Sequence, residues 1–247
     1  MKMDSLDLNW NMFKIKSIAL LTALLYISSF DIKAQEITRL DASFQDYMEL
    51  LNAKGYEAYP FDISCLKDST YTLTFEMKEY VGGQDSEISS KEYISIKNRI
   101  MVTDFMRRKL STDELENIKR GSYDYENGIY SCSEKITIGF TPSDVDTVRY
   151  ARVSVEHMGA FSVDMKLKPI ENPLYEKPLY KYVTRPFKPS KFEEGEFIPL
   201  VLYCSFWFDA KHKVVRCCGE KEIDPLMTSE ILKYSPHYYV IGVRITK

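Results

Sequence analysis

The chain of 247 residues has little of what metal chemistry or strong electrostatic recognition requires. It holds three histidines and no CxxC pair, so the sequence predicts neither a metal centre nor a redox-active dithiol. The formal net charge is only −3, which does not favour nucleic acid or an anionic membrane as a partner. Nucleophile elbows, phosphate-binding loops, dinucleotide fingerprints and zinc-protease helices are also absent, so no cofactor is expected.

No hydrophobic run is long enough for a membrane span. The longest run, 18–30, is well short of the roughly 20 residues that a helix needs to cross a bilayer. Because two lysines precede this run and Ala34 offers a small residue for cleavage, we interpret 1–34 as a signal peptide, with 1–11 as a miscalled upstream start. An uncleaved anchor is the alternative. The sequence thus predicts a periplasmic or secreted protein, with no stable membrane span after cleavage.

The five cysteines are too few and too uneven in number for a disulfide framework. Three of them, Cys204, Cys217 and Cys218, lie in the segment VLYCSFWFDAKHKVVRCCGE, where the pattern predicts a β-hairpin. A three-residue turn over 210–212 places Cys204 opposite Cys218, and a turn shorter by one residue places it opposite Cys217. Since opposed strand residues lie within disulfide reach, we predict one cross-strand disulfide. Buried free thiols are the alternative.

Alternation of apolar and polar residues predicts strands through most of the chain. Three successive strand segments, separated by short turns, are expected to form an antiparallel meander. The stretch 81–90 reads as a polar loop. The sequence therefore predicts an α+β fold with largely antiparallel sheets and two to three short helices. The expected meander strands are 134–140, 146–156 and 160–168, and the expected helices are 40–54, 111–121 and 224–235.

Proline is concentrated in one segment, 169–196, in which Pro-Leu-Tyr occurs twice. Such a density of proline opposes helix and favours extended backbone. We interpret this segment as a Pro/Tyr-rich connector between an N-terminal α+β region, 35–168, and a C-terminal β-β-α-β region, 197–247. A single domain with one continuous sheet is equally compatible with the pattern.

Tyrosine is the one residue type in excess, with 18 copies in the chain. Several tyrosines lie in polar, loop-like surroundings, where we expect exposed rings. An exposed tyrosine offers an amphipathic surface to carbohydrate or protein, whereas the alternative is that these rings cover the sheet. The candidate ligand-binding residues are Tyr123, Tyr125, Tyr175, Tyr180 and Tyr182.

The leader ending in IKAQE and the run FDAKHKVVRCCGEKEIDPLMTSEILKYSPHYYVIGVRI resemble uncharacterised secreted proteins of Gram-negative gut-type bacteria, which form a family of unknown function. The resemblance implies no activity and no functional residues. We therefore interpret the chain as an exported, non-catalytic binding or structural module without assigned catalytic residues, and with a glycan or an envelope protein as candidate partner. The alternative is a hydrolase of glycan or peptide that uses carboxylates such as Asp124 and Glu126.

Overall fold

The structure is a computed structural model, and it describes most of the chain from residue 44 onward. Outside the described residues lie the predicted signal peptide, Tyr175, Cys218 and Glu126, together with the side chains of Tyr123 and Tyr125. No helix in the described part of the chain is long and apolar enough to cross a bilayer. The described ranges are 44–82, 87–114, 122–125, 128–142, 145–174, 176–191, 193–217 and 219–247.

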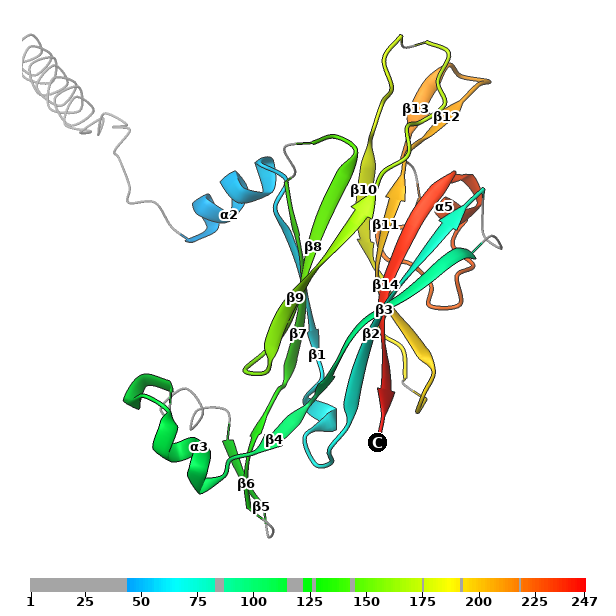
Figure 1. Cartoon of the computed structure of the whole chain (residues 1–247). Helices are drawn as coiled ribbons and strands as arrows, with labels where there is room; N and C mark the ends of the chain where they lie inside the picture. Colours follow the sequence, from blue (N-terminus) through cyan, green and yellow to red (C-terminus); the bar gives the residue numbers. More distant parts are fainter. Residues whose placement is uncertain are drawn as a thin grey trace, which may run out of the picture. The chain divides into compact units, whose positions relative to one another are not determined.

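Two antiparallel sheets form the body of the fold (Figure 1). The first has the strand order β1-β7-β8-β9 and contains the meander that the sequence predicted, which is confirmed. Its strands are β1 (Glu57–Asp62), β7 (Lys135–Thr141), β8 (Val148–Val155) and β9 (Gly159–Lys166). The second has the order β10-β11-β14-β2-β3, with strands β10 (Tyr182–Pro186), β11 (Phe197–Ser205), β14 (His237–Thr246), β2 (Thr72–Val81) and β3 (Glu87–Lys97).

The inner faces of the two sheets share one apolar core. Along each strand alternate residues point inward, because successive side chains leave a strand on opposite faces. The fold is therefore a β-sandwich, richer in strand than the predicted α+β class implies, although the antiparallel pairing is confirmed. The core includes Leu73, Phe75, Ile136, Ile138, Phe140, Val153, Val163, Met165, Val201, Ile241 and Val243.

The outer face of the five-stranded sheet carries a second apolar cluster. Leu202 and Tyr238 extend from this face, and the short helix α5 (Glu230–Tyr234) covers them with Ile231 and Leu232. All four side chains are fully buried. The five-stranded sheet is thus covered on both faces, which explains why β11 and β14 are almost continuously apolar.

The proline-rich segment does not divide the sheet. It supplies β10, which pairs with β11 along one edge. Strand β14, from the region after the segment, pairs along its whole length with β2, from the region before it. One continuous sheet is therefore formed, which is one of the two arrangements that the sequence left open.

Smaller elements extend from this body. They are the helices α2 (Phe44–Ala53) and α3 (Asp104–Lys109), a 3-10 helix (Ser64–Leu66), the hairpin β12 (Trp207–Asp209) with β13 (Val214–Arg216), and a three-stranded sheet of β4 (Arg99–Met101), β6 (Gly128–Cys132) and β5 (Ser122–Tyr125).

The predicted helices are confirmed to different extents. Helix α2 lies within 40–54, and Gly55 ends it with a φ of 84° as a C-terminal glycine does. In the second predicted helix, Ser111 and Glu114 form a capping box, with the Ser111 backbone N–H donating to Glu114 Oε2 at 2.8 Å. The remainder of that helix, from residue 115, lies outside the described residues.

The predicted start of the last helix at Asp224 is wrong. The Asp224 carboxylate accepts a hydrogen bond from the Leu226 backbone N–H at 2.9 Å, and Met227 has a φ of 60°. Aspartate therefore closes a local turn here and does not cap a helix, which begins only at Glu230. The predicted loop over 81–90 is also wrong at its end, since β3 begins at Glu87. Its polar side chains suit an exposed edge strand.

Both predicted hairpin registers are wrong. Asp209 faces Val214, so the turn has four residues, and Lys213 rather than His212 has the positive φ, 54°. Phe206 separates β11 from β12, which leaves Cys204 in β11 between Val183 and Tyr238. Cys204 and Cys217 are free thiols, so the Cys204–Cys217 bridge is not formed, and Cys218 lies outside the described residues. Cys204 is a buried member of the second apolar cluster.

Candidate functional site

The structure does not gather the predicted tyrosines into one surface. Tyr123 and Tyr125 belong to β5 in the small sheet, and only their backbone is described. Tyr175 lies outside the described residues. Tyr180 precedes β10 and is half-buried, and Tyr182 is the first residue of β10. Of the five, Tyr182 alone has described contacts within a larger cluster of polar side chains.

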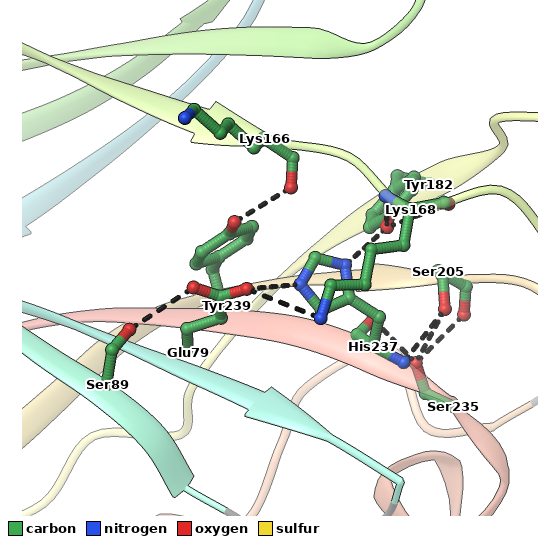
Figure 2. Close-up of polar contacts among 9 residues, drawn as sticks. All are labelled: Glu79, Ser89, Lys166, Lys168, Tyr182, Ser205, Ser235, His237 and Tyr239. Atoms are coloured by element: carbon green, nitrogen blue, oxygen red, sulfur yellow. Dashed lines mark hydrogen bonds and ion pairs between the residues drawn. The ribbon is translucent and has the colours of Figure 1, made fainter.

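The centre of that cluster is His237, a buried histidine with 2% of its side chain exposed. Figure 2 shows its ring between side chains of two other strands. Its Nδ1 lies 2.5 Å from the Tyr182 hydroxyl, and its Nε2 lies 3.0 Å from Glu79 Oε1. Strand register explains the meeting. Glu79 pairs with Tyr239 on β14, so Glu79 and His237 are diagonal neighbours on the inner face of the sheet.

The partners of His237 define its protonation. Burial lowers the pKa of His237 and outweighs the opposing effect of Glu79, so the imidazole is neutral at neutral pH. Since the Glu79 carboxylate can only accept, the single ring proton lies on Nε2. Nδ1 then accepts from the Tyr182 hydroxyl, and that hydroxyl in turn accepts from the Lys168 backbone N–H at 2.9 Å.

Two serines fix the backbone of His237. The His237 N–H donates to Ser205 Oγ at 3.2 Å, and the Ser235 hydroxyl contacts the His237 carbonyl oxygen at 3.1 Å (Figure 2). Ser235 lies just after α5, and Ser205 is the last residue of β11. The helix end and two strands therefore hold the histidine in place.

The Glu79 carboxylate connects this buried network to the surface. Its Oε2 accepts from the Ser89 hydroxyl on β3 at 3.2 Å, and its Oε1 lies 3.9 Å from Lys168 Nζ (Figure 2). Nearby, the Tyr239 hydroxyl donates to the Lys166 carbonyl oxygen at 2.8 Å. Glu79 is thus held by groups from β3, β14 and the segment after β9.

A pocket of about 420 Å³ lies beside Glu79, between the edge strands of the two sheets. Its wall carries three lysines and two carboxylates, so the lining has one positive charge in excess. This concentration of charge in one small recess is the feature that the sequence reading missed. The polar and aromatic lining residues are Glu79, Ser89, Lys91, Tyr93, Asp164, Lys166, Lys168 and Tyr239.

The two pocket tyrosines act as neutral groups. Burial raises the pKa of Tyr93 to about 12 and raises that of Tyr239 further. The Tyr93 ring stacks on Phe161 with centroids 6.0 Å apart, and Lys91 Nζ lies 4.5 Å from its centroid. Because the Tyr93 ring is already in contact with Phe161 and Lys91, polar groups dominate what the pocket can offer a ligand.

Glu79, His237 and Tyr182 form the acid–base–hydroxyl order of a proton relay. Burial raises the pKa of Tyr182 well above its ordinary value, so its hydroxyl stays protonated and serves as a donor. The described residues contain no group of three or more histidine, cysteine or acidic side chains placed to hold a metal ion. The hydrogen bonds of His237 to Tyr182 and Glu79 therefore fix the position of Glu79 in the pocket wall.

Comparison with known proteins identifies a family for the chain but no activity. The model of one family, described as a domain of unknown function (DUF5041), matches residues 26–247. No curated protein and no solved structure matches the chain.

Proposed function

Because the chain belongs to the DUF5041 family, whose description names no activity, we propose a function from the site itself. The protein is an exported, non-catalytic binding module, and the pocket beside Glu79 takes a saccharide that bears a carboxylate. The observation that carries this proposal is that three lysines and two carboxylates line one pocket.

The lining matches an acidic saccharide group by group. Lys91, Lys166 and Lys168 supply ammonium donors for a ligand carboxylate, and charge-assisted hydrogen bonds are the stronger kind. Glu79 and Asp164 can accept hydrogen bonds from sugar hydroxyls. A purely anionic ligand would meet these two carboxylates, whereas a ligand with both hydroxyls and one acid group suits both sets.

The case against catalysis rests on how Glu79 is held. Its two oxygens already contact His237, Ser89 and Lys168. A hydrolase remains the rival for a specific reason: Glu79 and Asp164 line one pocket, and glycoside hydrolysis uses two carboxylates on either side of a bond. Release of reducing ends from an acidic oligosaccharide, lost in Asp164→Asn, would favour the rival.

Export is supported by the leader that the sequence predicts. The test is fractionation of the native host followed by N-terminal sequencing. We expect mature protein in the periplasm or medium that begins just after Ala34. Native protein that begins at Met1 or Met12 and fractionates with the cytosol would contradict export.

Binding is tested by calorimetric titration with glucuronic-acid disaccharides and with glucose disaccharides as the neutral counterpart. We expect the acidic ligand alone to bind, and Lys166→Gln to weaken it about tenfold or more, the effect of losing one charge-assisted hydrogen bond. Lys97→Gln is the matched control, since Lys97 is an exposed lysine of β3 that does not line the pocket. Equal affinity for both ligands, no binding, or equal effects of the two variants would contradict the proposal.

A further inference from the structure

A second pocket, of about 470 Å³, lies between the β12–β13 hairpin and α5. It shares no residue with the charged pocket beside Glu79, and it is on the α5 side of the five-stranded sheet. An inference about it therefore stands or falls separately from the function proposed above.

One wall of this pocket is aromatic. Trp207 of β12 stacks on Tyr234 of α5, with ring centroids 5.5 Å apart and planes at 19°. Tyr234 keeps 54% of its surface exposed, so the stacked pair presents an apolar ring face to solvent. A ring face of this kind is an amphipathic contact surface, with a hydroxyl at its edge.

The neighbouring wall is polar and carries Asp209, Arg216 and Glu230, which leaves one negative charge in excess. Asp209 Oδ2 lies 2.7 Å from Arg216 Nε and 2.7 Å from His212 Nδ1. The hydrogen bond from His212, helped by Arg216, lowers the pKa of Asp209 and keeps it ionised. Arg216 Nε is buried against Asp209, whereas the Arg216 side chain as a whole is 35% exposed, so its other N–H groups are the donors that a ligand can reach.

The back of the pocket is set by a close approach of two segments. At Gly219 an added Cβ would lie 2.8 Å from Ile231 Cβ, and Ile231 is itself buried in the second apolar cluster. Only glycine leaves room for this approach. The segment just after β13 therefore packs directly against α5 at this side of the pocket.

We propose that this pocket binds one pyranose ring of a neutral saccharide. The C–H face of the sugar lies on the Trp207–Tyr234 pair, and sugar hydroxyls bond Asp209 and Arg216. An anionic ligand is disfavoured, because Arg216 is already paired with Asp209 and Glu230 adds a second carboxylate to the lining. The inference goes beyond the acidic-saccharide function and uses a different chemistry: ring stacking in place of lysine ammonium groups.

Tryptophan fluorescence gives a direct test, because the chain has two tryptophans, Trp10 and Trp207. In full-length Trp10→Phe protein the emission comes from Trp207 alone. Titration with cellohexaose, maltohexaose and mannohexaose is expected to give a saturable change with at least one of them. No saturable change with any of the three would overturn the proposal.

Variants of Tyr234 separate stacking from structure. Tyr234→Ala should weaken binding about threefold to tenfold, the usual effect of losing one aromatic contact, and Tyr234→Phe should retain it. Tyr234→Leu keeps an apolar side chain without a ring and should weaken binding as much as Tyr234→Ala does. It replaces Tyr234→Ala as the test if that variant does not fold. Lys166→Gln should change nothing here. Unchanged binding by Tyr234→Leu, or a loss caused by Lys166→Gln, would contradict the assignment.

Discussion

The β2–β14 strand pair carries a carboxylate bound to a base on each of its faces, and the two bases differ. On the outer face Glu76, 4% exposed, accepts from Arg244 Nε at 2.8 Å. On the inner face Glu79 accepts from the buried His237. The two acids are three residues apart on one strand, which places them on opposite sides of the sheet.

The identity of the base decides whether the charge of each pair depends on pH. Burial alone would raise the pKa of Glu76, but hydrogen bonds from Ser90 and Arg244 outweigh it, so the pKa is lowered and the pair stays charged. A guanidinium remains charged at any ordinary pH, whereas the imidazole of His237 can change its charge. The outer pair is therefore a fixed structural tie, and the inner pair is a polar support whose state depends on pH.

The largest effect is expected from Glu76→Ala. It leaves the Arg244 guanidinium without its acid, and about 2–3 kcal/mol of unfolding free energy should be lost. This is less than the roughly 3–5 kcal/mol of a fully buried pair, because Arg244 is 32% exposed. Urea unfolding measures this. The Glu76→Gln/Arg244→Met double variant should recover most of the loss. A double variant no more stable than the single one would mean that the uncompensated charge is not the cause.

The support of the outer pair can be broken without touching either charge. In Gly242→Ala the new Cβ would meet the Ile198 carbonyl oxygen and the Phe197 ring, over which the Arg244 guanidinium lies at 5.8 Å. Overpacking of this kind should cost about 2 kcal/mol in thermal unfolding. Gly139→Ala is the matched control, because its nearest neighbour would be at 3.7 Å. Equal losses in the two variants would count against the packing explanation.

The inner pair should make stability depend on pH. The pKa of His237 in the folded chain lies below its ordinary 6.5, so the unfolded chain takes up the proton first as the pH falls. The free energy of unfolding should therefore have its full value above pH 6.5 and decrease as the pH falls below 6.5. His237→Gln should cost about 1 kcal/mol at pH 8 and remove that part of the slope, whereas Arg244→Lys should retain it. Urea unfolding from pH 5 to 8 checks this, and an unchanged slope in His237→Gln would exclude the histidine as its source.

The smallest effect is expected at the surface of the inner pair. Lys168 is 46% exposed and 3.9 Å from Glu79, so Lys168→Gln should cost less than about 0.5 kcal/mol. The Lys168 ammonium also disfavours a positive charge on His237, so the Lys168→Gln variant should have a raised His237 pKa. An NMR titration of the His237 ring measures that shift. A lowered pKa would show that Lys168 acts mainly through Glu79.

Local patterns predicted local structure well. The meander followed from alternation within each strand, and the capping box at Ser111 followed from spacing alone. The hairpin was predicted, but its register was wrong, because the turn length and the interruption at Phe206 depend on how Cys204 is held by the neighbouring strands. The prediction that Asp224 caps the last helix was wrong, because an aspartate side chain can either close a turn or cap a helix. The local sequence does not decide between the two.

The candidate site could not be found in this way. Glu79 and His237 are 158 positions apart, and only the pairing of β2 with β14 brings them together. Tyr182 was selected as an exposed platform, yet it is half-buried and serves as a donor to His237. The sequence offered one signal of this site. Glu79 is on the inward side of a strongly alternating strand, and a carboxylate that points inward requires a polar partner.

Strand β14 lies at the centre of its sheet but follows every other strand of that sheet in the chain. During synthesis β2 and β11 leave the ribosome before β14, the strand that lies between them in the sheet. Until β14 is made, each of them has an edge with unpaired backbone groups. The five-stranded sheet can close only when 237–246 has emerged, so its two halves stay unpaired until then. A fragment that ends before 237 would lack the strand that joins β2 and β3 to β10 and β11, and its five-stranded sheet could not form.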